Sequence, residues 1–186
     1  IIDKGSRVVI LGLNGAGKTT LLRILAGELE SDTGSVAHGQ GLKIGYYAQE
    51  HETLDVTKTV LENMQSAAPE LADTDARKVL GSFLFSGDDV NKLAGVLSGG
   101  EKTRLALASL VVSKANVLLL DEPTNNLDPA SRQEILSALA SFTGAVVLVS
   151  HDVGAVDALN PERVLVMPDG QEDLWNEGYR DLIVLS

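Results

Sequence analysis

A glycine-rich loop joins an apolar run to a helical pattern near the start of this chain, and it limits the possible folds more than any other stretch. Residues 7–12 read RVVILG, which is typical of a buried strand, and residues 18–29 read KTTLLRILAGEL, whose apolar residues recur at helical spacing. Three glycines, Gly12, Gly15 and Gly17, lie in the turn between them. A strand that passes through such a tight turn into a helix predicts an α/β fold.

Further along the chain, short apolar runs continue to alternate with helical patterns. Residues 115–121, 144–150 and 163–167 read as three more apolar strands, and residues 129–142 read as a helix that opens on a proline. Strands that alternate with helices predict a mostly parallel sheet. The glycine-containing stretch at residues 35–49 predicts instead a small antiparallel β piece.

Between these parts the pattern becomes helical from Thr57 to about Phe85, with four apolar side chains on one face (Val79, Leu80, Phe83 and Leu84). We therefore expect a helical subdomain inserted into the α/β core. The predicted organisation is one domain over residues 1–186, with the α/β core at 1–52 and 96–186 and the helical subdomain at 53–95.

Composition excludes several classes of protein. A chain of 186 residues with 44% hydrophobic residues can bury a core, and the absence of cysteine excludes disulfide scaffolds and thiolate metal sites. It also fits a reducing compartment, so we expect a cytoplasmic protein. No apolar run reaches the length of a membrane span, and the start has no signal-peptide pattern. Because the chain does not begin with methionine, we expect a piece of a longer protein.

The stretch GLNGAGKT matches the pattern G-x-x-x-x-G-K-[ST] and has the strand before it and the helix after it that a phosphate-binding loop requires. A glycine-rich turn with an exposed lysine is the alternative, and this context argues against it. Backbone N–H groups of the loop would surround phosphate oxygens, Lys18 would reach the β and γ phosphates, and the Thr19 hydroxyl would bind Mg²⁺. The predicted ATP-binding residues are Gly12, Leu13, Asn14, Gly15, Ala16, Gly17, Lys18, Thr19 and Thr20.

Two carboxylates end the apolar strand in VLLLDEPTNNLD. Asp121 is placed to join the Mg²⁺ site, and Glu122 is placed to orient or deprotonate the attacking water. Acids are common at strand ends, so the pair becomes informative only together with the phosphate loop.

The stretch LSGGEKTRLALASL opens a helix on Ser98, Gly99 and Gly100. A hydroxyl and small residues at the positive end of a helix predict a second phosphate-binding helix start.

These motifs, together with Ser150–Asp152 (SHD), occur in the order found in nucleotide-binding domains of the ATP-binding cassette (ABC) superfamily, which the chain resembles from end to end. The resemblance implies a P-loop NTPase core and Mg²⁺-dependent ATP hydrolysis. It implies that Gln49 is the loop glutamine that contacts Mg²⁺ and that Asp128 lies at the contact between two domains. It also implies that His151 contacts the γ-phosphate. A lone histidine is more often structural, so we expect structural roles for His38 and His51.

In this superfamily a facing domain completes the ATP site with its own LSGG. The resemblance therefore implies that Ser98, Gly99 and Gly100 contact the ATP of a partner cassette and that ATP hydrolysis is complete only with that partner. The partner would be a second cassette in the full-length chain or a second copy of this one.

Three stretches resemble the ABC-F branch, whose members carry two cassettes in one chain and act on the ribosome. They are EKTRLALASL after LSGG, LGSFLFSGDDV before it, and the tail DGQEDLWNEGYRDLI, which is similar to the glycine-tyrosine element that ends ABC-F cassettes. We expect the C-terminal cassette of such a protein. Each stretch also has a plainer interpretation. The charges after LSGG are also typical of a solvated helix face, Phe83 and Phe85 of packing within the helical subdomain, and Trp175 and Tyr179 of aromatic side chains in the core. The alternative function is the nucleotide-binding subunit of a membrane transporter. About 80 residues separate the phosphate loop from LSGG, too few for the coiled coil of a chromosome-binding machine.

The net charge of −11 argues against an extended RNA-binding surface on this piece. If the protein acts on the ribosome, we expect its basic contacts elsewhere in the full-length chain. No aromatic residue precedes Tyr46, so the stacking partner that the family uses for adenine is not predicted within these residues.

Overall fold

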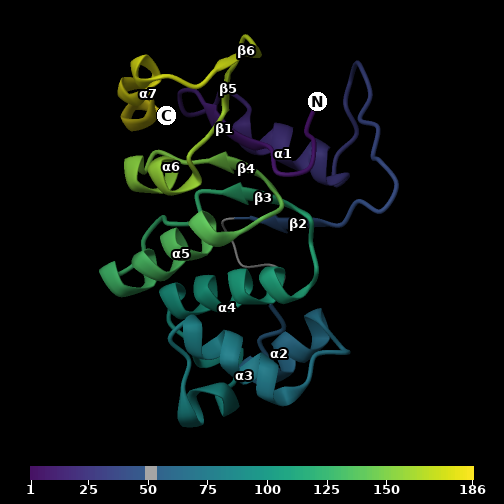
Figure 1. The fold of residues 1–186 in the computed structure, drawn as a ribbon, viewed down its shortest axis with the longest axis vertical. Helices are drawn as coiled ribbons and strands as arrows, with labels where there is room; N and C mark the ends of the chain where they lie inside the picture. Colours follow the sequence, from purple (N-terminus) through teal and green to yellow (C-terminus); the bar gives the residue numbers. More distant parts are fainter. Residues whose placement is uncertain (49–53) are drawn as a thin grey trace.

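A six-stranded sheet lies at the centre of the computed structural model, which describes residues 1–48 and 54–186 (Figure 1). In sheet order the strands are β2 (Ile44–Tyr47), β3 (Val117–Asp121), β4 (Ala145–Val149), β1 (Arg7–Leu11), β5 (Arg163–Val166) and β6 (Gln171–Leu174). All neighbouring strands run parallel except β5 and β6. The prediction of an α/β fold with a mostly parallel sheet is therefore confirmed.

An antiparallel pair is present, but the sequence located it wrongly. Within residues 35–48, all of which the structure describes, the strand is β2, and β2 runs parallel to β3 with Tyr47 opposite Leu120. The antiparallel pair is formed by β5 and β6, joined by a short turn at Gly170 (φ 68°). The glycines at 39 and 41 suggested a hairpin, whereas the Asn116 side chain ties this stretch to β3 by bonding the Lys43 N–H and the Gly41 carbonyl, each at 2.9 Å.

Helices cover both faces of the sheet because both faces are apolar. Alternate side chains of β1 divide between two buried clusters: Val8 and Ile10 pack with Leu22 of α1 (Lys18–Ala26), and Val9 and Leu11 pack on the opposite side. The opposite side holds α4 (Gly99–Val112), α5 (Pro129–Ser141), α6 (Val153–Leu159) and α7 (Arg180–Leu185) (Figure 1). The result is a layered arrangement in which parallel strands are buried on both sides.

The boundaries of the helices follow from local signals. Helix α1 ends at Ala26 rather than at the predicted Leu29 because Gly27 adopts a left-handed conformation (φ 80°) and its N–H bonds the carbonyls of the last turn. Helix α5 begins at Pro129 after Asp128, whose carboxylate accepts the Ser131 N–H.

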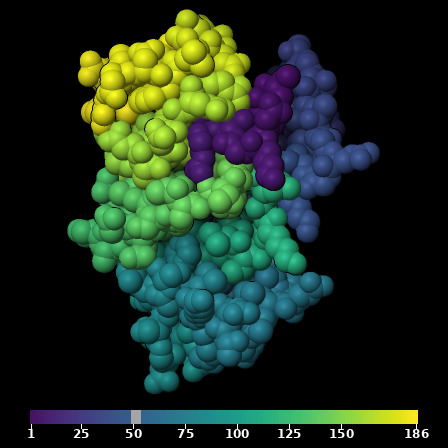
Figure 2. Space-filling view, in the orientation of Figure 1, coloured from purple at the N-terminus to yellow at the C-terminus, as the bar shows by residue number. Residues whose placement is uncertain are grey.

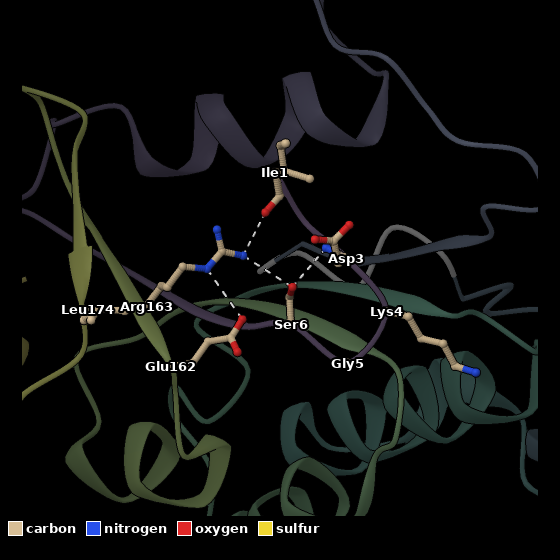
Figure 3. Close-up of a pocket in the computed structure, with 8 residues that line it drawn as sticks. All are labelled: Ile1, Asp3, Lys4, Gly5, Ser6, Glu162, Arg163 and Leu174. Atoms are coloured by element: carbon tan, nitrogen blue, oxygen red, sulfur yellow. Dashed lines mark hydrogen bonds and ion pairs between the residues drawn. The ribbon is translucent and has the colours of Figure 1, made fainter.

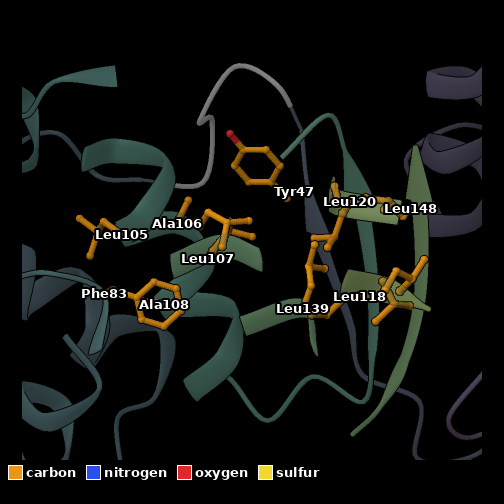
Figure 4. Packing of buried hydrophobic residues seen from close by; sticks show 14 of the residues in the cluster. Tyr47, Phe83, Leu105, Ala106, Leu107, Ala108, Leu118, Leu120, Leu139 and Leu148 are labelled. Carbon is orange, nitrogen blue, oxygen red and sulfur yellow. The ribbon is translucent and has the colours of Figure 1, made fainter. Parts of the chain in front are cut away.

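The region from 54 to 96 is mostly helical and projects from one end of the molecule (Figure 2). It holds α2 (Val60–Ala67), α3 (Asp73–Ser82) and two short 3₁₀ helices, Gly87–Asn91 and Ala94–Val96. Its two ends run side by side, since Val60 N–H bonds the Lys92 carbonyl and Ala94 N–H bonds the Lys58 carbonyl. Buried residues of α2 and α3 join those of α4 in the same apolar cluster that reaches the sheet, part of which Figure 4 shows.

Within the residues that the structure describes, none of the helices has the length and hydropathy of a membrane span.

An ion pair links α5 to the start of α6. The Arg132 guanidinium donates two hydrogen bonds to the Asp152 carboxylate, at 2.8 and 2.7 Å, and Asp152 caps α6 by accepting the Gly154 N–H at 2.8 Å. The hydrogen bonds from Arg132 are the largest cause that lowers the pKa of Asp152, which falls from its ordinary value of 3.8 to about 2. The ionised carboxylate is therefore stabilised more in the folded than in the unfolded chain.

We predict that Arg132→Met lowers the free energy of unfolding at neutral pH by about 1 kcal/mol, because the ion pair is partly exposed and screened by solvent. Since the folded pKa of Asp152 is depressed, its contribution is present above about pH 4 and is lost as the pH falls toward about 2. Urea denaturation at about pH 7 and pH 3 should show the difference from wild type shrinking at low pH, with the exposed Arg77→Met as control. A difference independent of pH would contradict this account.

Two glycines give a matched pair of opposite predictions. Gly81 lies in α3 with open space around it, so Gly81→Ala should raise the free energy of unfolding by about 0.5–1 kcal/mol. In β2, a side chain on Gly45 would lie 3.0–3.1 Å from atoms of Leu118, Ala115 and Leu110, so Gly45→Ala should lower the free energy by about 1–3 kcal/mol. Thermal and urea denaturation measure the free energy of unfolding of each variant. Equal changes in the two variants would contradict the difference in packing around Gly81 and Gly45.

Candidate functional site

Three loops meet at one edge of the sheet. Because β1 pairs with β4 and β4 pairs with β3, all in parallel, their carboxyl ends lie together. The loop after β1 holds residues 12–17, the loop after β3 starts at Glu122, and the loop after β4 holds Ser150–Asp152. Such an edge is where ligands of open α/β sheets bind.

The loop after β1 turns through three glycines with positive φ: Gly12 (156°), Gly15 (84°) and Gly17 (93°). A Cβ on Gly12 would come within 2.7 Å of the Met167 carbonyl oxygen, so a side chain cannot fit there. Gly17 is the N-cap of α1 and offers no side-chain acceptor to the first N–H groups of the helix. These N–H groups therefore remain available to an anion at the positive end of the helix.

Two residues far along the chain support this loop, and sequence reasoning did not predict them. Met167 follows β5 and its N–H bonds the Leu11 carbonyl at 2.8 Å, while the Ser186 hydroxyl accepts the Gly12 N–H at 3.2 Å. Neither residue type carries a local signal for such a role, because only the pairing of β5 with β1 brings Met167 to the loop.

Lys18 begins α1 and is 9% exposed. Its ammonium donates a hydrogen bond to the Gly12 carbonyl across the loop. Burial lowers the pKa of Lys18, and the Glu122 and Asp121 carboxylates act in the opposite direction. The cation therefore belongs to the same electrostatic group as the acids at the end of β3.

Thr19 and Asp121 lie in contact, because the Thr19 hydroxyl donates to the Asp121 carboxylate at 2.6 Å. Burial raises the pKa of Asp121, whereas the hydrogen bond from Thr19 and the charge of Lys18 lower it. Within the described residues, no three His, Cys, Asp or Glu side chains group closely enough to hold a metal ion by themselves. The third predicted Mg²⁺ ligand, Gln49, lies outside the residues that the structure describes, and so does His51.

Glu122 and His151 form a close pair. Glu122 has a positive φ (50°), and its N–H continues the ladder by bonding the Val149 carbonyl at 2.9 Å. Its carboxylate lies 2.9 Å from His151 Nδ1 and also accepts the His151 N–H at 3.3 Å. A non-glycine residue held in this strained conformation is typical of functional sites. The strand ends thus aim the carboxylate at the imidazole.

Ser98, Gly99 and Gly100 form a different group together with Asp128. Ser98 caps α4 in a capping box: its hydroxyl accepts the Glu101 N–H at 3.2 Å, and Glu101 accepts the Ser98 N–H at 2.7 Å. A Cβ on Gly100 would lie 3.0 Å from a carboxylate oxygen of Asp128. Lys18, Thr19 and Asp121 together are called here the Lys18–Asp121 group. In the described part of the chain, the hydrogen bonds of Ser98 and Asp128 stay at the starts of α4 and α5 and do not reach that group.

The other histidine and the tail aromatics have local partners. His38 is exposed, with its Nε2 3.0 Å from the Leu25 carbonyl. Trp175 and Tyr179 stack with their ring centroids 6.1 Å apart, and both pack against the main apolar cluster.

A hollow of about 460 Å³ lies at the opposite edge of the sheet. Its lining includes Ser6, just before β1, and Glu162 and Arg163, where β5 begins (Figure 3). Arg163 is held there by Ser6, the Ile1 carbonyl and Glu172. This hollow is therefore at the amino ends of the strands and is separate from the phosphate loop.

Solved structures share this fold. The ABC transporter cassette MJ0796 matches with a TM-score of 0.78 and 24% sequence identity over 95% of this chain and 88% of that chain. Its post-hydrolysis state bound to ADP and Pi matches with a TM-score of 0.77, the same identity and the same coverage. At this identity the match establishes the fold alone.

Curated relatives are closer in sequence. YheS of Haemophilus influenzae is 49% identical over 80% of this chain, and a homologue of ATP-binding cassette sub-family F member 3 in Encephalitozoon cuniculi is 42% identical over 91%. GCN20 of Saccharomyces cerevisiae is 37% identical over 100% of this chain. The chain spans 23%, 30% and 25% of the lengths of these three proteins.

The family model described as ABC transporter matches residues 1–125, which include the phosphate loop, LSGG and the strand that ends in Asp121. The chain therefore belongs to the ATP-binding cassette family, and its sequence resembles the cassettes of sub-family F.

Proposed function

We propose that this chain binds Mg-ATP at the start of α1 and hydrolyses it as one half of a pair of cassettes. The observation that carries the proposal is the convergence at one sheet edge of an uncapped helix start, the Lys18 ammonium and the Thr19–Asp121 pair. Free N–H groups and a cation suit phosphate oxygens, and a hydroxyl beside a carboxylate suits Mg²⁺.

The residues present fit Mg²⁺ better than a metal that needs an all-protein site. Mg²⁺ keeps several waters and is held by one or two protein oxygens together with substrate phosphates. The Thr19 hydroxyl and the Asp121 carboxylate would supply the protein oxygens, with Gln49 proposed as a third. Bound Mg²⁺ would neutralise charge on the phosphates during their transfer.

Glu122 is proposed to orient the attacking water and to accept its proton. The carboxylate is held by the His151 imidazole and the His151 N–H, so it does not need to be ordered during the reaction. His151 is also proposed to contact the γ-phosphate, and Lys18 to neutralise the charge that spreads over that group in the transition state.

Ser98, Gly99 and Gly100 are proposed to contact the ATP of a partner cassette. Within the described part of this chain they make no contact with the Lys18–Asp121 group, so an ATP bound at that group would not also occupy them. The phosphate that they bind would therefore come from the ATP of another cassette. The solved relative MJ0796 is described as dimeric. Asp128 would lie at the same contact, since it borders Gly100.

At the level of the whole protein, we propose a two-cassette ABC-F factor that acts on the ribosome in the cytoplasm. The stretches after and before LSGG and the similarity to a sub-family F homologue support this branch. The net charge of −11 suggests that other parts of the full-length protein make the main RNA contacts. The second candidate function, a transporter subunit, is favoured only by the description of the matching family model.

We predict that this cassette alone binds Mg-ATP and hydrolyses it slowly, with a turnover per molecule that rises with protein concentration. Two cassettes that complete each other's site give this dependence. Calorimetry measures ATP binding, and phosphate release across a dilution series measures turnover. High turnover that persists at strong dilution would refute the need for a partner.

Two substitutions separate ATP binding from ATP hydrolysis. Lys18→Ala should weaken Mg-ATP binding about 10-fold or more, because one charge-assisted contact to phosphate is lost. Glu122→Gln should keep binding within about 2-fold but lower turnover by about 10²-fold or more, because the general base is removed. If Glu122→Gln retains normal turnover, the proposed role of Glu122 is wrong.

We predict that the full-length protein with Glu122→Gln sediments with ribosomes when ATP is present, because slow hydrolysis holds the two cassettes closed. The wild-type protein with ADP is the control. Recovery with membranes and absence from the ribosomal fraction would favour the transporter function instead.

A further inference from the structure

Arg104 is a buried cation that the proposed site does not use. It lies in the second turn of α4, six residues after Ser98, and is 9% exposed. Its Nη1 donates to the Phe83 carbonyl at 2.7 Å, and its guanidinium carbon lies 4.9 Å from the centre of the Phe85 ring. Among the described residues, no group bonds its buried Nε. The side chain thus joins α4 to the segment that follows α3.

The segment that Arg104 holds, Phe83–Phe85, has a strained backbone. Phe85 N–H bonds the Leu80 carbonyl and Leu84 N–H bonds the Gly81 carbonyl, which closes the end of α3. Leu84 occupies the left-handed position of this turn (φ 66°), where glycine is normally preferred. Contacts from outside must therefore help to hold this turn, and the Arg104 contacts to Phe83 and Phe85 do so.

Two acids near Arg104 extend the connection. Hydrogen bonds from Ser131 are the main cause that lowers the pKa of Asp128, at the start of α5, and the hydrogen bond from Lys92 is the main cause that lowers the pKa of Asp89, in the 3₁₀ helix Gly87–Asn91. The charge of Arg104 is the last and smallest cause in each case. Asp128 also borders Gly100 at the start of α4. Arg104 therefore lies between the helical region and the part of the core that flanks Ser98–Gly100.

Stability alone does not account for an arginine here. Burying a guanidinium whose Nε has no partner among the described residues is unfavourable. A buried polar atom without a partner is uncommon in folded proteins and calls for a specific explanation.

We propose that Arg104 is a positioning residue that holds the start of α4 at a fixed place relative to the helical region, so that Ser98–Gly100 can meet the nucleotide of a partner cassette. This inference rests on the proposed function. The contacts of Arg104 described above go to Phe83 and Phe85, and among the described residues none goes to Lys18, Thr19 or Asp121. Loss of Arg104 should therefore affect turnover and not ATP binding.

The test compares Arg104→Met, Arg104→Lys and Phe85→Leu in the full-length protein. Arg104→Met should lower kcat about 10-fold or more while the Kd for Mg-ATP stays within about 2-fold, because a displaced helix start spoils alignment only when two cassettes close. Arg104→Lys keeps the charge over the Phe85 ring and should recover part of kcat. Phe85→Leu keeps the bond to Phe83 and should lower kcat about 3-fold.

Arg77→Met, on the exposed side of α3, is the matched control and should leave kcat unchanged. The melting temperature of Arg104→Met should stay within about 4 °C of wild type. A merely structural role would lower the melting temperature and the ATP affinity together with kcat, and that result would overturn the proposal. A kcat within about 2-fold of wild type in Arg104→Met would overturn it as well.

If Arg104→Met fails to fold, Arg104→Lys and Phe85→Leu decide the question, and normal kcat in both overturns the proposal. Lys18→Ala separates this inference from the proposed function. A wild-type protein that neither binds nor hydrolyses ATP would refute both. Normal wild-type turnover that Lys18→Ala abolishes, together with Arg104 variants that change nothing, would refute the role of Arg104 alone.

Discussion

The start of α1 has backbone N–H groups that no side chain in the described part of the chain caps, and the rest of the site depends on this one constraint. The glycine at the cap position gives the helix no acceptor of its own, so the loop can surround an anion. The parallel ladder from β1 through β4 to β3 then places Asp121 against Thr19 and Glu122 against His151. A shift of the strands by one residue would turn these side chains to the wrong face.

Burial and mutual attraction together set the charge states of Lys18 and Asp121. Burial raises the pKa of Asp121 and lowers that of Lys18, so each group alone is pushed toward its neutral form. The attraction between them acts against both shifts and favours the charged pair. Such an arrangement supplies fixed charge in a partly desolvated site, where it would act more strongly on the proposed phosphate ligand than it would in water.

Helix α4 connects the sheet to the helical region of residues 54–96. Its first turn carries Ser98–Gly100, its buried residues share one apolar cluster with the sheet and with α2 and α3, and Arg104 bonds the turn after α3. Because packed cores transmit displacements rather than absorb them, the position of the helical region and that of the LSGG stretch are linked. The proposed dependence of turnover on a partner cassette gives this link a function.

The sequence by itself determined the fold class, the glycine-rich turn after β1 and the acids at the end of β3, since apolar periodicity and glycine spacing are local signals. Local signals failed at residues 35–48, because whether β2 pairs in parallel depends on β3, which is about 70 residues away. Tertiary structure alone decided that Glu122 meets His151, that Met167 and Ser186 support the loop, and that Arg132 holds Asp152. Each of these contacts joins residues distant in sequence, and no local pattern encodes which strands become neighbours.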